Sequence, residues 1–140
     1  MTTTPKAVCA RMDGLPIEAL EQVAAYFQVL SEPTRLQILN LLRQREHNVG
    51  ELAHLCGYTS ANISRHLAML TQHGLVARES RGTAVYYRIA DDSIYALCDL
   101  VCGRIAQQLD DTAQQRDWFA PPARRRAAPK KSRDTAHSEG

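Results

Sequence analysis

The chain of 140 residues carries a formal net charge of +2, with 44% hydrophobic and 23% charged residues. This length fits one compact domain with flanking segments. The sequence has no run of about 18 apolar residues, which excludes a membrane-spanning helix, and its first residues lack the apolar stretch of a signal peptide. We therefore expect a cytoplasmic protein, in which four irregularly spaced cysteines are more typical of thiols, metal ligands or redox switches than of a disulfide framework.

Charge is distributed unevenly along the chain. Residues 33–89 carry seven arginines and three acidic residues, whereas residues 91–117 carry six aspartates and two arginines. From residue 120 onward, six arginines or lysines face two acidic residues. The basic middle and the basic end are the parts that favour a polyanion such as nucleic acid. Residues 120–140 show no apolar period and predict a disordered basic tail, which either adds non-specific DNA affinity or only solubilises the protein.

Apolar spacing predicts five helices and one hairpin, after an irregular arm at residues 1–15. The helices cover approximately residues 17–30, 33–44, 50–56, 60–72 and 93–109, with a polar break at 45–50. Two short runs, 75–80 and 84–90, alternate in the manner of strands and flank the turn segment Arg81-Gly82-Thr83. The order predicts a mainly helical domain with a small β-hairpin.

The third and fourth predicted helices form a helix-turn-helix, since only Gly57-Tyr58-Thr59 separates them. In such a motif the second helix reads DNA, and the hairpin that follows forms a wing beside it. Ser and Asn side chains bond base edges or phosphates, and Arg takes the guanine edge with two bonds. The candidate DNA contacts are Thr59, Ser60, Asn62, Ser64, Arg65 and His66 of the helix, and Arg81 and Thr83 of the wing. Singly, each has an ordinary alternative, a helix cap or a solvated surface group, so it is their arrangement that favours DNA binding.

Five short motifs identify a family resemblance over residues 20–110. They are Pro33-Thr34-Arg35, Gly50-Glu51-Leu52-Ala53, Ser64 followed by His66-Leu67, Gly74-Leu75-Val76, and Gly82 ahead of Tyr86-Tyr87. With these motifs the chain resembles the ArsR/SmtB family of winged-helix repressors. The resemblance implies a winged helix-turn-helix fold and a homodimer joined through the first and last helices. It also implies binding to double-stranded operator DNA and release when an inducer binds.

The domain organisation expected from this resemblance has three parts. An N-terminal arm at 1–15 precedes the dimerising winged helix-turn-helix domain at 16–119, and the basic tail at 120–140 follows it. The first and last helices each have an apolar face that suits a dimer. Trp118 and Phe119 are expected near the end of the last helix, packed against a partner or against the first helix.

The inducer is sought at the positions where the family carries its sensor residues. Asn48-Val49-Gly50 replaces the Cys-Val-Cys of one sensor type, only Asp91 remains of a zinc-binding set, and Met69 and His73 replace two cysteines of another type. The cysteines of this chain are Cys9, Cys56, Cys98 and Cys102.

Cys98 and Cys102 stand four residues apart in the last predicted helix. That spacing separates the Cβ atoms by about 5–6 Å, wider than the roughly 3.5–4.5 Å of a disulfide, and favours a soft ion bridging two thiolates. Family members with cysteines in this helix include arsenite sensors. We therefore expect arsenite or another thiophilic metal ion as inducer, held by Cys98 and Cys102 with Cys9 as third ligand.

Several alternatives remain open at this point. The two thiols could instead sense oxidants or reactive sulfur, or could simply be small buried hydrophobic groups in a DNA-binding protein without a ligand. An enzyme is not expected, since no Ser-His-Asp set, glycine-rich phosphate loop or catalytic carboxylate pair is evident. The histidines lack close metal-ligand partners, and most are expected at the surface: His47, His54, His66, His73 and His137.

Overall fold

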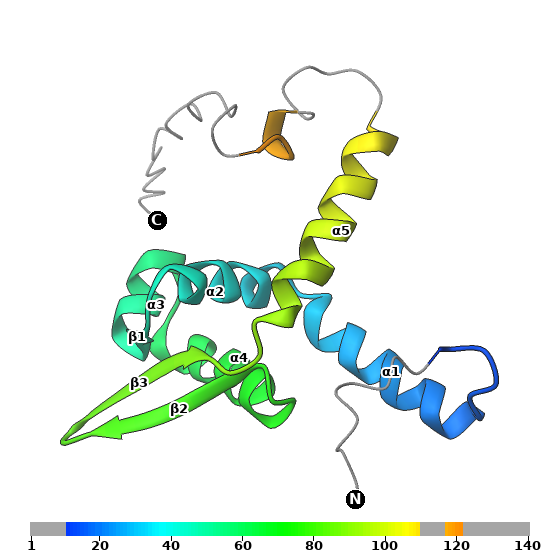
Figure 1. Ribbon diagram of the computed structural model, residues 1–140. Coiled ribbons are helices and arrows are strands. Elements are labelled where there is room, and N and C mark those ends of the chain that lie inside the picture. Colours follow the sequence, from blue (N-terminus) through cyan, green and yellow to red (C-terminus); the bar gives the residue numbers. More distant parts are fainter. Residues whose placement is uncertain (1–10, 110–116, 122–140) are drawn as a thin grey trace, which may run out of the picture. The chain divides into compact units, whose positions relative to one another are not determined.

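The computed structural model describes residues 11–109 and 117–121. The chain divides after Asp92 into two compact units, Met1–Asp92 and Ser93–Gly140. The elements are α1 (Ile17–Leu30), α2 (Pro33–Gln44), β1 (His47–Asn48), α3 (Val49–Cys56), α4 (Ser60–Gln72), β2 (Val76–Arg81), β3 (Ala84–Ile89) and α5 (Ser93–Gln108) (Figure 1). This order confirms the predicted mainly helical fold with a hairpin. Within the described part of the chain, no helix is long and apolar enough to cross a membrane.

The core of the first unit is built by helices α2, α3 and α4. Their apolar residues recur at helical spacing, so each helix turns one face toward the others. The side chains that are essentially inaccessible to solvent include Ile38 of α2, Leu52 of α3, and Ile63, Leu67 and Leu70 of α4. Burying a side chain of this kind contributes about 1.5–3 kcal/mol, so this cluster fixes the orientation of α4.

The turn between α3 and α4 is set by two local features. Gly57 has a φ of 73°, a left-handed conformation that glycine adopts without a Cβ clash, and its N–H donates to the carbonyl oxygen of Ala53. Thr59 then caps α4, because its Oγ1 accepts the N–H of Asn62 at 3.1 Å. Together they let α4 begin with only three residues between it and the end of α3.

The sheet contains one strand more than the sequence predicted. Its order is β1-β3-β2, and all pairs are antiparallel. β1 occupies two residues of the predicted polar break, where His47 pairs with Tyr87. Arg81 pairs with Ala84, so the turn consists of Gly82 and Thr83 alone and Arg81 belongs to β2. Figure 1 shows the β2–β3 hairpin projecting beyond α3 and α4 as a wing.

The second unit contains α5, which begins and ends close to its predicted bounds. α5 ends at Gln108, and Trp118 is 57% exposed, so the expected packing of Trp118 and Phe119 against a partner or α1 stays a prediction. Cys9 lies outside the described residues, as do residues 1–10 of the predicted arm and 122–140 of the predicted tail. The predicted domain boundaries therefore stay predictions.

Candidate nucleic-acid interface

Helix α4 exposes the face opposite to its buried residues. At about 100° per residue, Arg65 points almost directly away from the core, and its side chain is exposed. Ser60 and Ser64 lie on one flank of this face and are exposed, whereas Asn62 and His66 lie on the other flank and are half-buried. The six predicted contacts at the start of α4 are thus brought to one end of the helix but point in different directions.

Thr59 and Ser60, two neighbouring hydroxyl residues at the start of α4, have different roles. Thr59 supplies the side-chain cap, as its hydrogen bond to the Asn62 N–H shows. Ser60 is therefore not required as the cap, and its exposed hydroxyl is left for an external partner. The helix cap, which was the alternative role considered for Ser60, is thus supplied by Thr59.

An open hollow of about 430 Å³ lies along the Asn62 flank of α4. Its lining residues come from the start of α2, from the turn before α4 and from α4 itself: Glu32, Thr34, Arg35, Tyr58, Asn62, Arg65, His66 and Met69. Burial lowers the pKa of His66, the charges of Arg35 and Arg65 lower it further, and Glu32 opposes them. The imidazole is therefore neutral at neutral pH, and two guanidinium groups and one carboxylate carry the charge of the hollow.

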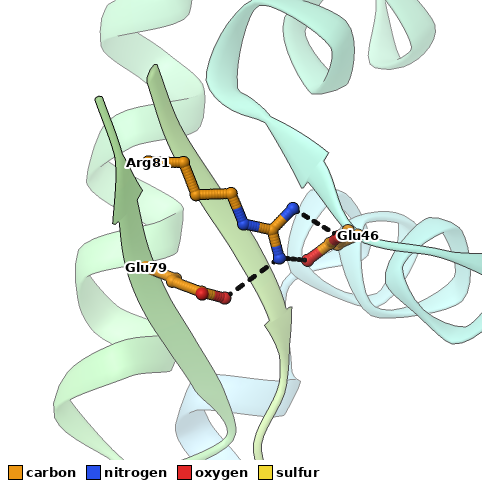
Figure 2. A network of polar contacts seen from close by, with 3 residues as sticks. All are labelled: Glu46, Glu79 and Arg81. Carbon is orange, nitrogen blue, oxygen red and sulfur yellow. Dashed lines mark hydrogen bonds and ion pairs between the residues drawn. The ribbon is translucent and has the colours of Figure 1, made fainter. Parts of the chain in front are cut away.

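The wing residue Arg81 is held by two carboxylates, as Figure 2 shows. Its Nη1 and Nη2 donate to Oε1 and Oε2 of Glu46, both at 2.7 Å, and Nη2 also donates to Glu79 at 3.1 Å. The guanidinium carbon lies 5.0 Å from the centre of the Tyr86 ring. The hydrogen bond from Arg81 lowers the pKa of Glu46. Glu46 precedes β1, so this cluster ties the wing to the loop after α2; we call it the wing clamp. Thr83 is exposed in the turn.

His47 is buried, and so is an exception to the expectation that most of the histidines lie at the surface. Its side chain is 4% exposed, and its Nδ1 donates to Oε2 of Glu51 at 2.8 Å. Arg45 lies 3.3 Å from the same carboxylate oxygen, and Glu51 belongs to the first turn of α3. A glutamate four residues after the histidine was the signal that could have indicated this pair.

The cysteines within the described residues are thiols rather than disulfides. Cys56 at the end of α3 is half-buried, and burial raises the pKa of its thiol. On α5, Cys98 is half-buried and Cys102 is exposed, so the two predicted ligands lie on one helix at the expected spacing. In residues 11–109 and 117–121, no three His, Cys, Asp or Glu side chains gather so as to hold a metal ion.

Comparison with known proteins decides the family. Residues 32–78 match the model of "Bacterial regulatory protein, arsR family". The transcriptional regulator Rv0081 of Mycobacterium tuberculosis is 36% identical over 101 residues, which cover 71% of this chain and 87% of that protein. The chain belongs to the ArsR family. This ArsR-family protein also superimposes on the crystal structure of Rv0081 with a TM-score of 0.60, over 69% of this chain and 96% of the other.

Two further relatives support the same conclusion. The ArsR-family chain is 35% identical to the regulator KmtR of M. tuberculosis over 85 residues, 61% of this chain and 65% of KmtR. A fragment of Mb0332 from Mycobacterium bovis, described as a homodimeric winged helix-turn-helix DNA-binding domain, gives a TM-score of 0.58 at 33% identity, covering 71% of this chain and 98% of the fragment. The predicted family and winged helix-turn-helix fold are confirmed, and the protein is a transcriptional regulator, not an enzyme.

Proposed function

We propose that this ArsR-family regulator is a homodimeric repressor whose two α4 helices read an operator with two-fold symmetry. The observation that carries the proposal is the exposed polar face at the start of α4, held in place by the capped turn and the buried stripe behind it. Ser60, Ser64 and Arg65 are suited to base edges, and the exposed Thr83 lies in the wing turn. Two such helices in a dimer would reach major grooves about 34 Å apart, one turn of the duplex.

Apolar surface on two helices supports the dimer. On α1, Ile17 is 63% and Phe27 is 49% exposed, and an apolar hollow of about 480 Å³ includes Val23 and Tyr26. On α5, Leu100 is 74% exposed. Exposed apolar side chains on each of these helices favour burial against a partner, and the homodimeric Mb0332 fragment offers a precedent within the family.

Selection of bound sequences from a random DNA pool tests the DNA-reading part of the proposal. The wild-type dimer should enrich a palindromic site, and Arg65→Ala should relax the preference at one base pair per half-site at a cost of about 1–3 kcal/mol. Arg104→Ala removes an exposed arginine of α5 and serves as the matched control, expected to leave sequence preference unchanged. Failure of the wild-type protein to enrich any site would refute the proposal.

The proposed inducer is a thiophilic ion, arsenite or a soft metal ion, bound by Cys98 and Cys102. Soft thiolates prefer soft ions, and residues four apart on a helix lie on one face and can share a ligand. The exposure of Cys102 gives such an ion access to the pair. Cys9 is proposed as the third sulfur. Binding would then restrain α5 and alter the spacing of the two reading helices.

Titration of arsenite and Cd(II) into the reduced protein on operator DNA tests this inducer. Release measured by fluorescence anisotropy should be lost in Cys98→Ser and Cys102→Ser, and weakened in Cys9→Ser. Cys56→Ser is the control, because that thiol lies at the end of α3 and is expected to be irrelevant to release. Equal release in Cys98→Ser and in the wild-type protein would exclude the proposed ion site.

A thiol-based sensor of oxidants or reactive sulfur is the second candidate, favoured by the exposure of Cys102. In that case persulfide treatment should release the DNA, and mass spectrometry should find the pair bridged by sulfur. Regulation that survives serine at all four cysteines would instead indicate a repressor without a thiol-bound ligand.

A further inference from the structure

The hollow beside α4 has the charge of an anion site. Arg35 reaches it from α2 and Arg65 from α4, while Glu32 supplies the one carboxylate. With His66 neutral, the lining carries a net charge of +1, which matches the single negative charge of a phosphodiester. The hollow is open to solvent, and arginines from two different helices line it. It therefore suits an anionic group that is part of a larger molecule.

Two residues that line this hollow each have a buried polar atom without a hydrogen-bond partner. The atoms are Nε of Arg35, which can only donate, and Oδ1 of Asn62. Leaving such a donor unpaired costs about 1–3 kcal/mol, so the pair indicates a missing partner. A phosphate oxygen would accept from Arg35 Nε. Rotation of the Asn62 amide by half a turn would present its NH₂ group to the same phosphate.

The start of α2 adds to the positive potential. Glu32 is the N-cap residue, no side chain caps the helix, and Pro33 occupies the first turn. Thr34 and Arg35 of that turn line the hollow. The first turn of a helix presents unpaired N–H groups and the positive end of the helix dipole, which favours phosphate oxygens.

We infer that the hollow between α2 and α4 seats one backbone phosphate of the operator, with Arg35 as its principal ligand. The inference rests on the proposed DNA-binding function and divides the surface of α4 by role. Asn62 and His66, on the flank facing α2, contact the phosphate and fix the register of the helix in the groove. Ser60 and Ser64, on the other flank, are left for base edges. Arg65 is exposed between the two flanks, and its positive charge attracts DNA on both of them.

The salt dependence of DNA binding tests the inference. Arg35→Gln should weaken binding to operator and to random DNA by the same factor, and should reduce the slope of log Kd against log salt by about 0.9, the value for one phosphate contact. Arg43→Gln, at the other end of α2, is the matched control and should leave the slope unchanged. Arg35→Lys should keep the slope and lose part of the affinity, because a lysine retains the charge but not the Nε donor. The melting temperature of each variant checks that it folds.

A neutral methylphosphonate moved along the operator locates the contact. At one position per half-site it should weaken the wild-type protein and have no additional effect on Arg35→Gln. An unchanged salt slope and an unchanged methylphosphonate profile in Arg35→Gln would overturn the inference while leaving the proposed function intact. If the wild-type protein enriched no DNA site, the inference and the proposed function would both fail. Release of the operator by inorganic phosphate at constant ionic strength would identify the hollow as a site for a free anion, and would also overturn the inference.

Discussion

The hydrogen-bonded pair of buried His47 and half-buried Glu51 gives the most direct test of how this fold is held together. Glu51→Ala removes the acceptor for the His47 Nδ1–H, which is bonded at 2.8 Å, and leaves a buried donor unpaired at a cost of about 1–3 kcal/mol. The same change removes a negative charge from the first turn of α3, worth about 0.3–1 kcal/mol. The ion pair with Arg45 adds little, since that side chain is 66% exposed. Because the Glu51 side chain is itself 33% exposed, we expect a net loss of about 2 kcal/mol.

Urea denaturation at a fixed protomer concentration measures this loss. The midpoint should fall without a change in m, because the same surface is exposed on unfolding. Glu51→Gln keeps an oxygen that accepts from His47 and should cost less than about 1 kcal/mol. Arg45→Ala should stay within about 0.5 kcal/mol of the wild type. Glu51→Ala with wild-type stability, or Glu51→Gln as unstable as Glu51→Ala, would refute the reasoning.

Three further predictions concern the wing, the hollow and the turn. If the wing clamp only positions the wing, Glu46→Gln and Arg81→Gln should weaken operator binding by similar factors and speed amide exchange in the hairpin. If Arg81 contacts DNA, only Arg81→Gln should weaken binding, and Glu46→Gln should strengthen it. The pKa of His66 is lower in the folded protein than in the unfolded chain, so on acidification the unfolded chain takes up the proton first. The stability that neutral His66 contributes is therefore complete above about pH 6.5, and it is lost as the pH falls toward the pKa of the folded protein. His66→Gln should therefore flatten the fall of stability with acidification in urea titrations, and an unchanged slope would contradict this. Gly57→Ala places a Cβ at a φ of 73° and should lower the unfolding free energy by about 1 kcal/mol, whereas substitution at Gly103 within α5 should not destabilise the protein.

The helices and the turn were predictable from the sequence because their determinants are local. Apolar residues repeat at helical spacing in α4, Gly57 marks the end of α3, and a hydroxyl residue stands at the start of α4. The candidate contacts on α4 followed directly from these features, because a buried stripe on one side leaves the remaining positions exposed or half-buried.

The features that escaped prediction depend on contacts between distant parts of the chain. Arg81 and Glu46 are 35 residues apart, and no sequence period connects them. β1 is too short to show alternation and exists because β3 offers it an edge. The hollow depends on how α2 packs beside α4, which brings Arg35 next to Asn62. At these places the residue types alone indicate which side chains can carry charge or form hydrogen bonds. The packing of the chain decides which partners those side chains meet.

The sheet order has a consequence for how the protein behaves in a crowded solution. β3 is paired on both sides, so β2 is an outer strand, and no other strand among the described residues pairs with its outer edge. Arg78, Glu79 and Arg81 follow one another along that edge, and all three are exposed. Charged side chains on an edge strand discourage pairing with the same edge of another molecule. The charges of the wing therefore protect an extended hairpin from aggregation.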